Sequence, residues 1–167
     1  MPGIGPTVSA TTRDRRPGEE DGREYHFLTQ AEFLDGIERG AFLEHVVYVS
    51  GNRYGTLRSE LDRIHGEGRV PLLELETEGA LRVKEEVRGA VTIFISAPVE
   101  ELERRLRERA TESDGEIEDR IALARHQLRQ APEFDYVVEN DDLDEAVERL
   151  TDLVRGLLAP PATMTRP

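Results

Sequence analysis

Three dense apolar runs organise the chain from residue 70 onward. They occupy residues 70–75, 90–96 and 134–138, and each is bounded by polar or turn-forming residues. Continuous apolar runs of this length are typical of strands buried on both faces of a parallel sheet. We therefore expect three buried parallel strands from these runs.

Helical spacing of apolar residues separates and follows the runs. Helices are predicted over residues 78–87, from residue 98, from residue 116 and from residue 140, where Asn140 is the expected cap. The apolar stripe of the last helix consists of Leu143, Val147, Leu150, Val154 and Leu157. Alternating strands and helices predict an α/β fold in which helices flank a parallel sheet.

The preceding region, residues 24–56, has a different pattern. Thr29 and Glu32 form a capping box before a helix that ends near Gly40. Shorter, half-polar strands are predicted around residues 24–28, 42–49 and 54–56, with turn residues between the last two. We predict a small mixed sub-domain here, followed by a helix over residues 57–65.

The chain has 167 residues, the length of one domain with a single core. We expect residues 1–6 to be a linker or a truncated upstream segment and residues 7–158 to form the domain. The Pro- and Thr-rich residues 159–167 are predicted to be a disordered tail. The residues give no indication of oligomeric state.

Composition excludes several classes of partner. A net charge of −13 argues against general affinity for nucleic acid or an anionic membrane, so a polyanion must be met by local arginine clusters. There is no Cys for disulfides or thiolate metal sites, and the four His residues share no metal-ligand spacing, so we predict no metal site. No membrane span or charged-then-apolar leader is evident, which predicts a cytoplasmic location.

Lys84 is the only lysine, and it lies in the helical segment RVKEEV. A phosphate-binding loop of the type G-x-x-x-x-G-K-S/T needs its Lys beside glycines. These 167 residues therefore contain no such loop.

The richest candidate chemistry lies near the N-terminus. A short run rich in β-branched residues ends in hydroxyls and is followed at once by arginines: Ser9, Thr11, Thr12, Arg13, Arg15 and Arg16. Arginine forks at the end of a strand suit a doubly charged phosphate. The alternative is an ordinary solvated polar loop.

Five blocks in order along residues 7–158 carry a family resemblance: VSATTRDRRPGEEDGREYHF, SGNRYGT, LLELETEGA, RRLRERATES and VVENDDL. Together they resemble the guanylate kinases, whose GMP-binding signature is similar to the first block. The resemblance implies a P-loop-kinase-type sheet, transfer of the ATP γ-phosphate to GMP, and ATP with Mg²⁺. Nothing in these residues corresponds to the family's first central strand, its P-loop or the helix after it.

The resemblance also implies site residues. Glu44 would accept the N1–H and 2-amino groups of guanine; adenine would leave this carboxylate unpaired. Glu76 matches a second acidic position, where the family usually has Asp. The other implied GMP ligands are Ser9 and Thr56 near the base, and Arg13, Arg16, Tyr25 and Tyr54 at the phosphate. Without the motifs, these carboxylates would be read as surface groups and the tyrosines as half-buried strand residues.

Residues 104–120 resemble the family's arginine-rich lid. Arg109 and Arg120 match the lid arginines and, with Arg16, are implied in catalysis; Arg105 is a weaker match, implied with Arg109 in binding ATP. Family members usually have Gly where this chain has Ala110. The alternative interpretation is a helix face of Glu–Arg pairs, each contributing only tenths of a kcal/mol.

Three interpretations of function follow. The first is an enzyme, expected to be inactive or very weak as this chain without the P-loop. The second is an inactive guanylate-kinase-like module that binds GMP or a phosphorylated peptide. The third is an incomplete chain, truncated or started internally. We favour the first and third together, and an in-frame G-x-x-x-x-G-K-S/T upstream of Met1 would discriminate.

Overall fold

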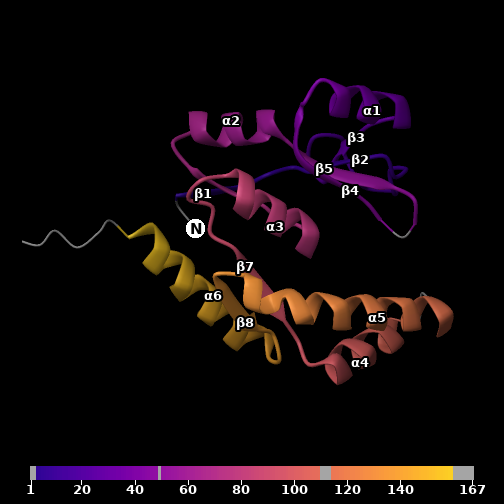
Figure 1. Ribbon diagram of the computed structural model, residues 1–167, viewed down its shortest axis with the longest axis vertical. Coiled ribbons are helices and arrows are strands. Elements are labelled where there is room, and N and C mark those ends of the chain that lie inside the picture. The colour runs from indigo at the N-terminus through magenta and orange to yellow at the C-terminus, as the bar shows by residue number, and fades with distance from the viewer. Residues whose placement is uncertain (1–2, 49, 110–113, 160–167) are drawn as a thin grey trace, which may run out of the picture. The chain divides into compact units, whose positions relative to one another are not determined.

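The computed structural model describes residues 3–48, 50–109 and 114–159 (Figure 1). The chain divides into two compact units, Met1–Ala90 and Val91–Pro167, which are described in turn. The predicted α/β fold, with parallel sheets flanked by helices, is confirmed. Its parallel strands belong to separate small sheets, two of which are purely parallel and two-stranded.

A four-stranded mixed sheet forms the centre of the first unit. Its strands, in the order β3-β2-β5-β4, are β2 (Ala10–Thr11), β3 (His26–Phe27), β4 (Phe42–Val47) and β5 (Arg53–Leu57). The predicted hairpin is confirmed, because β4 and β5 are antiparallel with Glu44 opposite Thr56. Gly51 supplies the positive φ of 80° that the connecting turn requires.

Helix α1 (Gln30–Glu38) packs on this sheet through aromatic contact. The capping box of Thr29 and Glu32 is present as predicted. Phe33 is fully buried and its ring is stacked on Phe42 with centroids 4.3 Å apart. Gly36 permits this approach, since a Cβ there would lie 2.8 Å from the Phe42 ring.

A second, two-stranded sheet of the first unit joins distant segments. Strand β1 (Ile4–Pro6) runs parallel to β6 (Val70–Leu72), and helices α2 (Arg58–Gly66) and α3 (Thr77–Glu86) precede and follow β6. The predicted linker at residues 1–6 is therefore wrong for Ile4–Pro6. This strand has no periodicity of its own and forms because its backbone pairs with β6.

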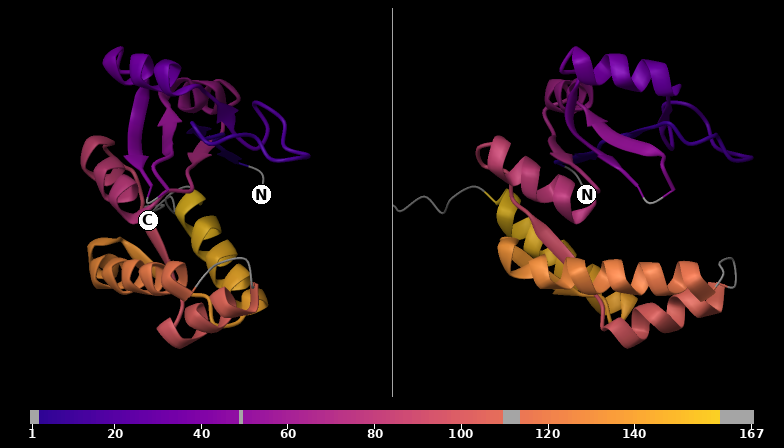
Figure 2. Two further views of the ribbon diagram at one scale, coloured as in Figure 1. Left: turned by 90° about the vertical axis from the view of Figure 1, so that its right-hand side faces the viewer. Right: turned by 45° about the vertical axis from the view of Figure 1, so that its right-hand side comes forward.

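The described residues of the second unit form a parallel pair of strands and three α-helices. The strands are β7 (Ile93–Ser96) and β8 (Tyr136–Glu139). The helices are α4 (Val99–Arg109), α5 (Asp114–Gln130) and α6 (Leu143–Leu158), with the short 3₁₀-helix η1 (Ala131–Glu133) before β8. Helices α4 and α5 lie side by side (Figure 2).

Two polar interactions fix the ends of these elements. The Asp135 carboxylate accepts hydrogen bonds from the backbone N–H and hydroxyl of Thr92, both at 2.8 Å, and so joins the starts of β7 and β8. Asp142 caps α6 by accepting from the N–H groups of Asp144 and Glu145. The prediction of Asn140 as this cap is wrong by two residues.

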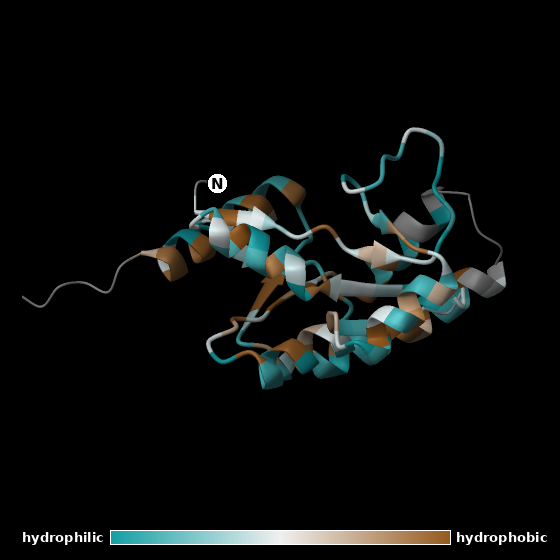
Figure 3. Cartoon of the chain, turned by 90° about the horizontal axis from the view of Figure 1, so that it is seen from above, coloured by the Kyte–Doolittle hydropathy of each residue, from teal (hydrophilic) through white to brown (hydrophobic). Residues whose placement is uncertain are grey.

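Burial of the apolar strands and of the α6 stripe differs from the prediction. Strand β6 is shorter than the apolar run, and Val70 and Leu72 are 51% and 47% exposed. In the second unit Ile95, Val137 and Leu143 are exposed, the last to 66%. Figure 3 shows hydrophobic and hydrophilic residues together along α6. A two-stranded sheet is narrow and offers little surface for a helix to pack on, so the apolar side chains of β6, β7 and β8 are only partly covered.

None of the helices in the described part of the chain is both long and apolar enough to cross a lipid bilayer.

A buried carboxylate joins α2 to the N-terminal half of the first unit. The Glu60 side chain is 8% exposed and accepts hydrogen bonds from Arg63 (Nη2, 2.7 Å) and from the Val8 backbone N–H (2.9 Å). Its other oxygen lies 3.4 Å from Nε2 of His26. The Arg63 hydrogen bonds, opposed by burial and helped by the Val8 N–H, lower the pKa of Glu60 to about 2.

Because the folded-state pKa lies below the unfolded value, the stabilisation by Glu60 is present above about pH 4.5 and is lost as the pH falls towards 2. The full shift corresponds to about 3 kcal/mol. In urea unfolding at pH 7, 4.5 and 3, the free energy of unfolding should decrease less with falling pH for Glu60→Gln than for the unmodified chain. Asp62→Asn, at an exposed site on the same helix, is the control. Parallel pH profiles for all three proteins would contradict the assignment.

Candidate functional site

An arginine and two tyrosines predicted to bind phosphate come together in the first unit. The Arg13 guanidinium carbon lies 5.4 Å from the centroid of the Tyr25 ring and 5.7 Å from that of Phe27. The Tyr25 and Tyr54 rings meet edge to face at 6.0 Å. These side chains come from the end of β2, the start of β3 and β5, and pairing within one sheet gathers them.

Glu19 is a residue of this cluster that the sequence did not identify. Its carboxylate accepts two hydrogen bonds from Arg13, at 2.8 and 3.1 Å, and one from the Arg16 backbone N–H at 2.7 Å. The hydrogen bonds that Arg13 donates to Glu19 raise the pKa of Arg13 and lower the pKa of Glu19. Arg13 is therefore held as a fixed cation with its guanidinium oriented by both the carboxylate and the aromatic rings.

Two hydroxyls of the segment predicted to bind phosphate accept hydrogen bonds from the backbone. Thr11 accepts a hydrogen bond from the Arg13 N–H at 3.1 Å, and Thr12 accepts from the Arg53 N–H at 2.9 Å. Ser9 is half-buried, and its carbonyl accepts the N–H of His26. The Arg16 side chain is exposed. The threonines thus shape the loop that presents the arginines.

Glu44 and Thr56 form a buried pair in the hairpin. They lie opposite each other in β4 and β5, and the Thr56 hydroxyl donates to Glu44 at 2.9 Å. Glu44 is only 4% exposed, and this burial raises the pKa of its carboxyl against the opposing effects of Thr56 and the Arg82 charge. A carboxylate with so few protein donors is suited to accept hydrogen bonds from a ligand.

Helix α3 contacts this carboxylate through a glycine that the sequence did not single out. A Cβ at Gly79 would lie 2.8 Å from Oε2 of Glu44, so only glycine leaves the carboxylate its observed position. Glu76, the second acidic residue implied for guanine, is exposed and begins the same helix as its N-cap through the backbone. The motif ETEG therefore brings a close-packed glycine and an exposed carboxylate to one end of α3.

The lid residues belong to the second unit. Arg120 is half-exposed on α5, whereas the side chains of Arg105 and Arg109, and residues 110–113, lie outside the described residues. The Glu–Arg pairing expected as the alternative is present in α4: Arg104 binds Glu101 and Arg107 binds Glu103. Both pairs are largely exposed and contribute little to stability.

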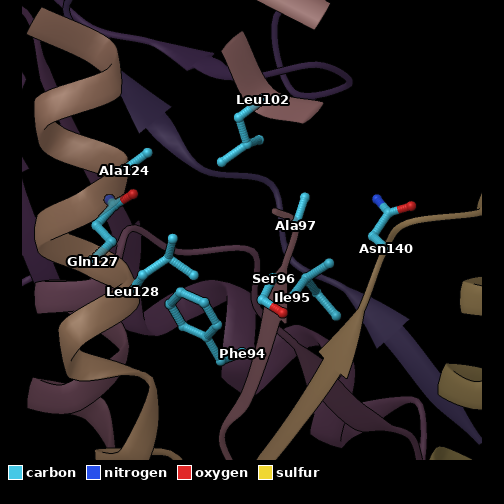
Figure 4. A pocket seen from close by; sticks show the side chains of 9 residues that line it. All are labelled: Phe94, Ile95, Ser96, Ala97, Leu102, Ala124, Gln127, Leu128 and Asn140. Atoms are coloured by element: carbon cyan, nitrogen blue, oxygen red, sulfur yellow. The ribbon is translucent and has the colours of Figure 1, made fainter. Parts of the chain in front are cut away.

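A cavity of about 210 Å³ lies within the second unit (Figure 4). It opens between α4, α5 and the ends of β7 and β8, and contains none of the predicted site residues. Its lining residues are Phe94, Ile95, Ser96, Ala97, Leu102, Ala124, Gln127, Leu128 and Asn140. Among the described residues no group of three His, Asp or Glu side chains could hold a metal ion.

Comparison with known proteins identifies the family. A family model described as guanylate kinase matches residues 4–157. The chain is 44% identical over 157 residues to a guanylate kinase of Synechococcus, covering 93% of this chain and 70% of the relative. It is 46% identical over 156 residues to that of Aromatoleum aromaticum, covering 93% and 76%.

The structure agrees with these matches. The solved guanylate kinase from Anaplasma phagocytophilum superposes with a TM-score of 0.75 at 33% identity, covering 92% of this chain and 76% of that one. The resemblance inferred from the five sequence blocks is thereby confirmed in both sequence and fold. The chain belongs to the guanylate kinase family of phosphotransferases.

Proposed function

We propose that the first unit of this chain binds GMP for phosphorylation by ATP. The buried Glu44–Thr56 pair is the observation that carries this proposal. In GMP the N1–H and 2-amino groups point in one direction and match the two oxygens of a carboxylate. Adenine lacks this pair of donors and would leave a desolvated carboxylate unpaired. The resulting loss of binding free energy makes AMP the weaker ligand.

The phosphate of GMP would be bound at the other end of the same sheet. Arg13 supplies a fixed charge, and the phenols of Tyr25 and Tyr54 supply donors beside it. Arg16 lies in the same loop with an exposed side chain able to reach an anion. Ser9 and Glu76 are proposed as further contacts to the base.

Transfer requires a GMP phosphate oxygen to attack the γ-phosphorus of ATP while the bond from that phosphorus to the β,γ-bridging oxygen breaks and ADP leaves. Charge on the transferring group is neutralised by arginines, for which we propose Arg16, Arg109 and Arg120. Arg105 and Arg109 are proposed as contacts to the donor nucleotide. Mg²⁺ is expected with ATP, but the described residues offer no set of metal ligands, so no step is assigned to it.

A binding module is the second candidate function. The cluster of Arg13, Tyr25 and Tyr54 suits any phosphate monoester, including that of a phosphorylated peptide. The observation favouring this candidate is that these 167 residues contain no G-x-x-x-x-G-K-S/T sequence. A preference for GMP over AMP would argue against a phosphorylated peptide as the ligand, whereas turnover with ATP distinguishes an enzyme from a module that binds GMP without catalysis.

Calorimetric titration should show GMP bound more tightly than AMP. Glu44→Ala should weaken GMP binding by about 2–3 kcal/mol, because hydrogen bonds to a charged group are lost. AMP binding should not weaken, because the variant lacks the carboxylate that adenine leaves unpaired. Glu38→Gln, at an exposed position of α1, is the matched control. Equal affinity for GMP and AMP, with no effect of Glu44→Ala, would refute the guanine assignment.

Gly79→Ala should impair GMP binding more than folding. The new Cβ would displace the Glu44 carboxylate, which is the movable end of a side chain, whereas alanine favours the helix by about 0.5–1 kcal/mol. We expect about tenfold weaker GMP binding in titration and a melting temperature close to that of the unmodified chain. Gly66→Ala, where a Cβ meets nothing within 4 Å, should leave binding unaltered. An unaltered affinity in Gly79→Ala would exclude the proposed contact.

A polypeptide of these 167 residues should transfer phosphate very slowly, because no lysine is available to the donor β- and γ-phosphates. A coupled assay of ADP release with GMP and ATP measures this on protein shown by titration to bind GMP. Turnover in the range of about 1–100 per second would be that of an ordinary kinase and would contradict the expectation.

A further inference from the structure

We propose that Glu60 is a positioning residue for GMP, acting through the two segments that carry Ser9 and Tyr25. This inference rests on the proposed GMP site and concerns a side chain outside it. None of the residues proposed to bind the ligand belongs to α2, and the hydrogen bonds of Glu60 run to Val8, His26 and Arg63.

One carboxylate connects three segments of the first unit. Oε2 of Glu60 accepts the Val8 backbone N–H at 2.9 Å and Nη2 of Arg63 at 2.7 Å. Oε1 lies 3.2 Å from Nε of Arg63 and 3.4 Å from Nε2 of His26. The side chain is almost fully buried, so its position is fixed from both sides.

The two segments held by Glu60 lead directly into the site. Val8 precedes Ser9, and His26 follows Tyr25. The same segments are joined to each other, because the His26 N–H donates to the Ser9 carbonyl at 2.9 Å. Helix α2 itself continues from β5, which carries Tyr54 and Thr56. Glu60 therefore sets the position of two ligand-bearing segments relative to a third.

A displacement at His26 would be transmitted to the phosphate end of the site. Tyr25 is half-buried, with its ring against Tyr54 and beneath the guanidinium of Arg13. Binding groups that act together need their relative positions held to within about 0.5 Å, and misplacement by about 1 Å can lower activity 100-fold.

An ion pair that served stability alone would need only Arg63, whose side chain is 42% exposed. Glu60 also accepts a hydrogen bond from Val8 and contacts His26, which lie 52 and 34 residues away in the sequence. Those contacts fix the loop before β2 and the start of β3. Through them the Glu60 carboxylate can affect GMP binding, which an ion pair confined to the surface could not do.

The test is calorimetric titration of GMP into the whole chain and four variants: Glu60→Gln, His26→Leu, the double variant, and Asp62→Asn as an exposed control on the same helix. The unmodified chain must first prefer GMP to AMP; if it does not, the proposed function fails and Glu60 is not at issue. We expect about tenfold weaker GMP binding in Glu60→Gln and a several-fold loss in His26→Leu, with no change in Asp62→Asn.

The double variant separates positioning from a general loss of stability. If Glu60 acts through His26, the double variant loses less affinity than the product of the two single losses. A cooperative thermal transition above the assay temperature confirms that each variant is folded, and His26→Leu decides the question if Glu60→Gln does not fold. GMP affinity within twofold of the unmodified chain in either folded single variant, strictly multiplicative losses, or an equal loss in Asp62→Asn would overturn the proposal.

Discussion

The register of one hairpin determines the candidate site. Glu44 and Thr56 face each other across β4 and β5, and this pairing buries a carboxylate with a single hydroxyl donor beside it in the sheet. A shift of one residue would turn Glu44 to the opposite face and remove both the burial and the hydroxyl. The close contacts around the hairpin oppose such a shift, since a Cβ at Gly55 would lie 2.7 Å from the Glu44 carbonyl and one at Gly79 would meet its carboxylate.

The phosphate end of the site follows from a different constraint, the net charge of −13. In so acidic a chain, a phosphate is attracted only where cations are gathered and held. Arg13 is held in place because Glu19 accepts hydrogen bonds from two of its guanidinium nitrogens and two aromatic rings lie against it. This ion pair also offsets the charge of Arg13, so a phosphate must use the remaining N–H groups of Arg13, take the place of Glu19 or bind the neighbouring Arg16.

Local features of this structure were predictable, whereas features that depend on distant partners were not. The capping box of α1 and the β4–β5 hairpin were predicted because their signals lie within a few residues. Strand β1 was missed because it is defined by pairing with β6. Leu143 and Val147 of the α6 stripe are exposed although their spacing is helical, because periodicity does not determine what packs against a helix. The motifs named Glu44 and Arg13 as candidates, whereas the contacts of Glu60 could not be predicted because its partners lie 34 and 52 residues away and have no spacing signal.

Two buried glutamates of the first unit differ in environment, and this difference underlies the two roles proposed for them. Burial raises the pKa of Glu44, which has few donors of its own and therefore retains capacity for the donors of a base. The Arg63 hydrogen bonds lower the pKa of Glu60, whose oxygens are already occupied by Arg63, Val8 and His26. Opposite shifts in residues of one type commonly separate functional roles. The carboxylate with the fewer protein partners, Glu44, is the one suited to a ligand, and the carboxylate with partners on three segments, Glu60, is the one suited to hold the strands that surround it.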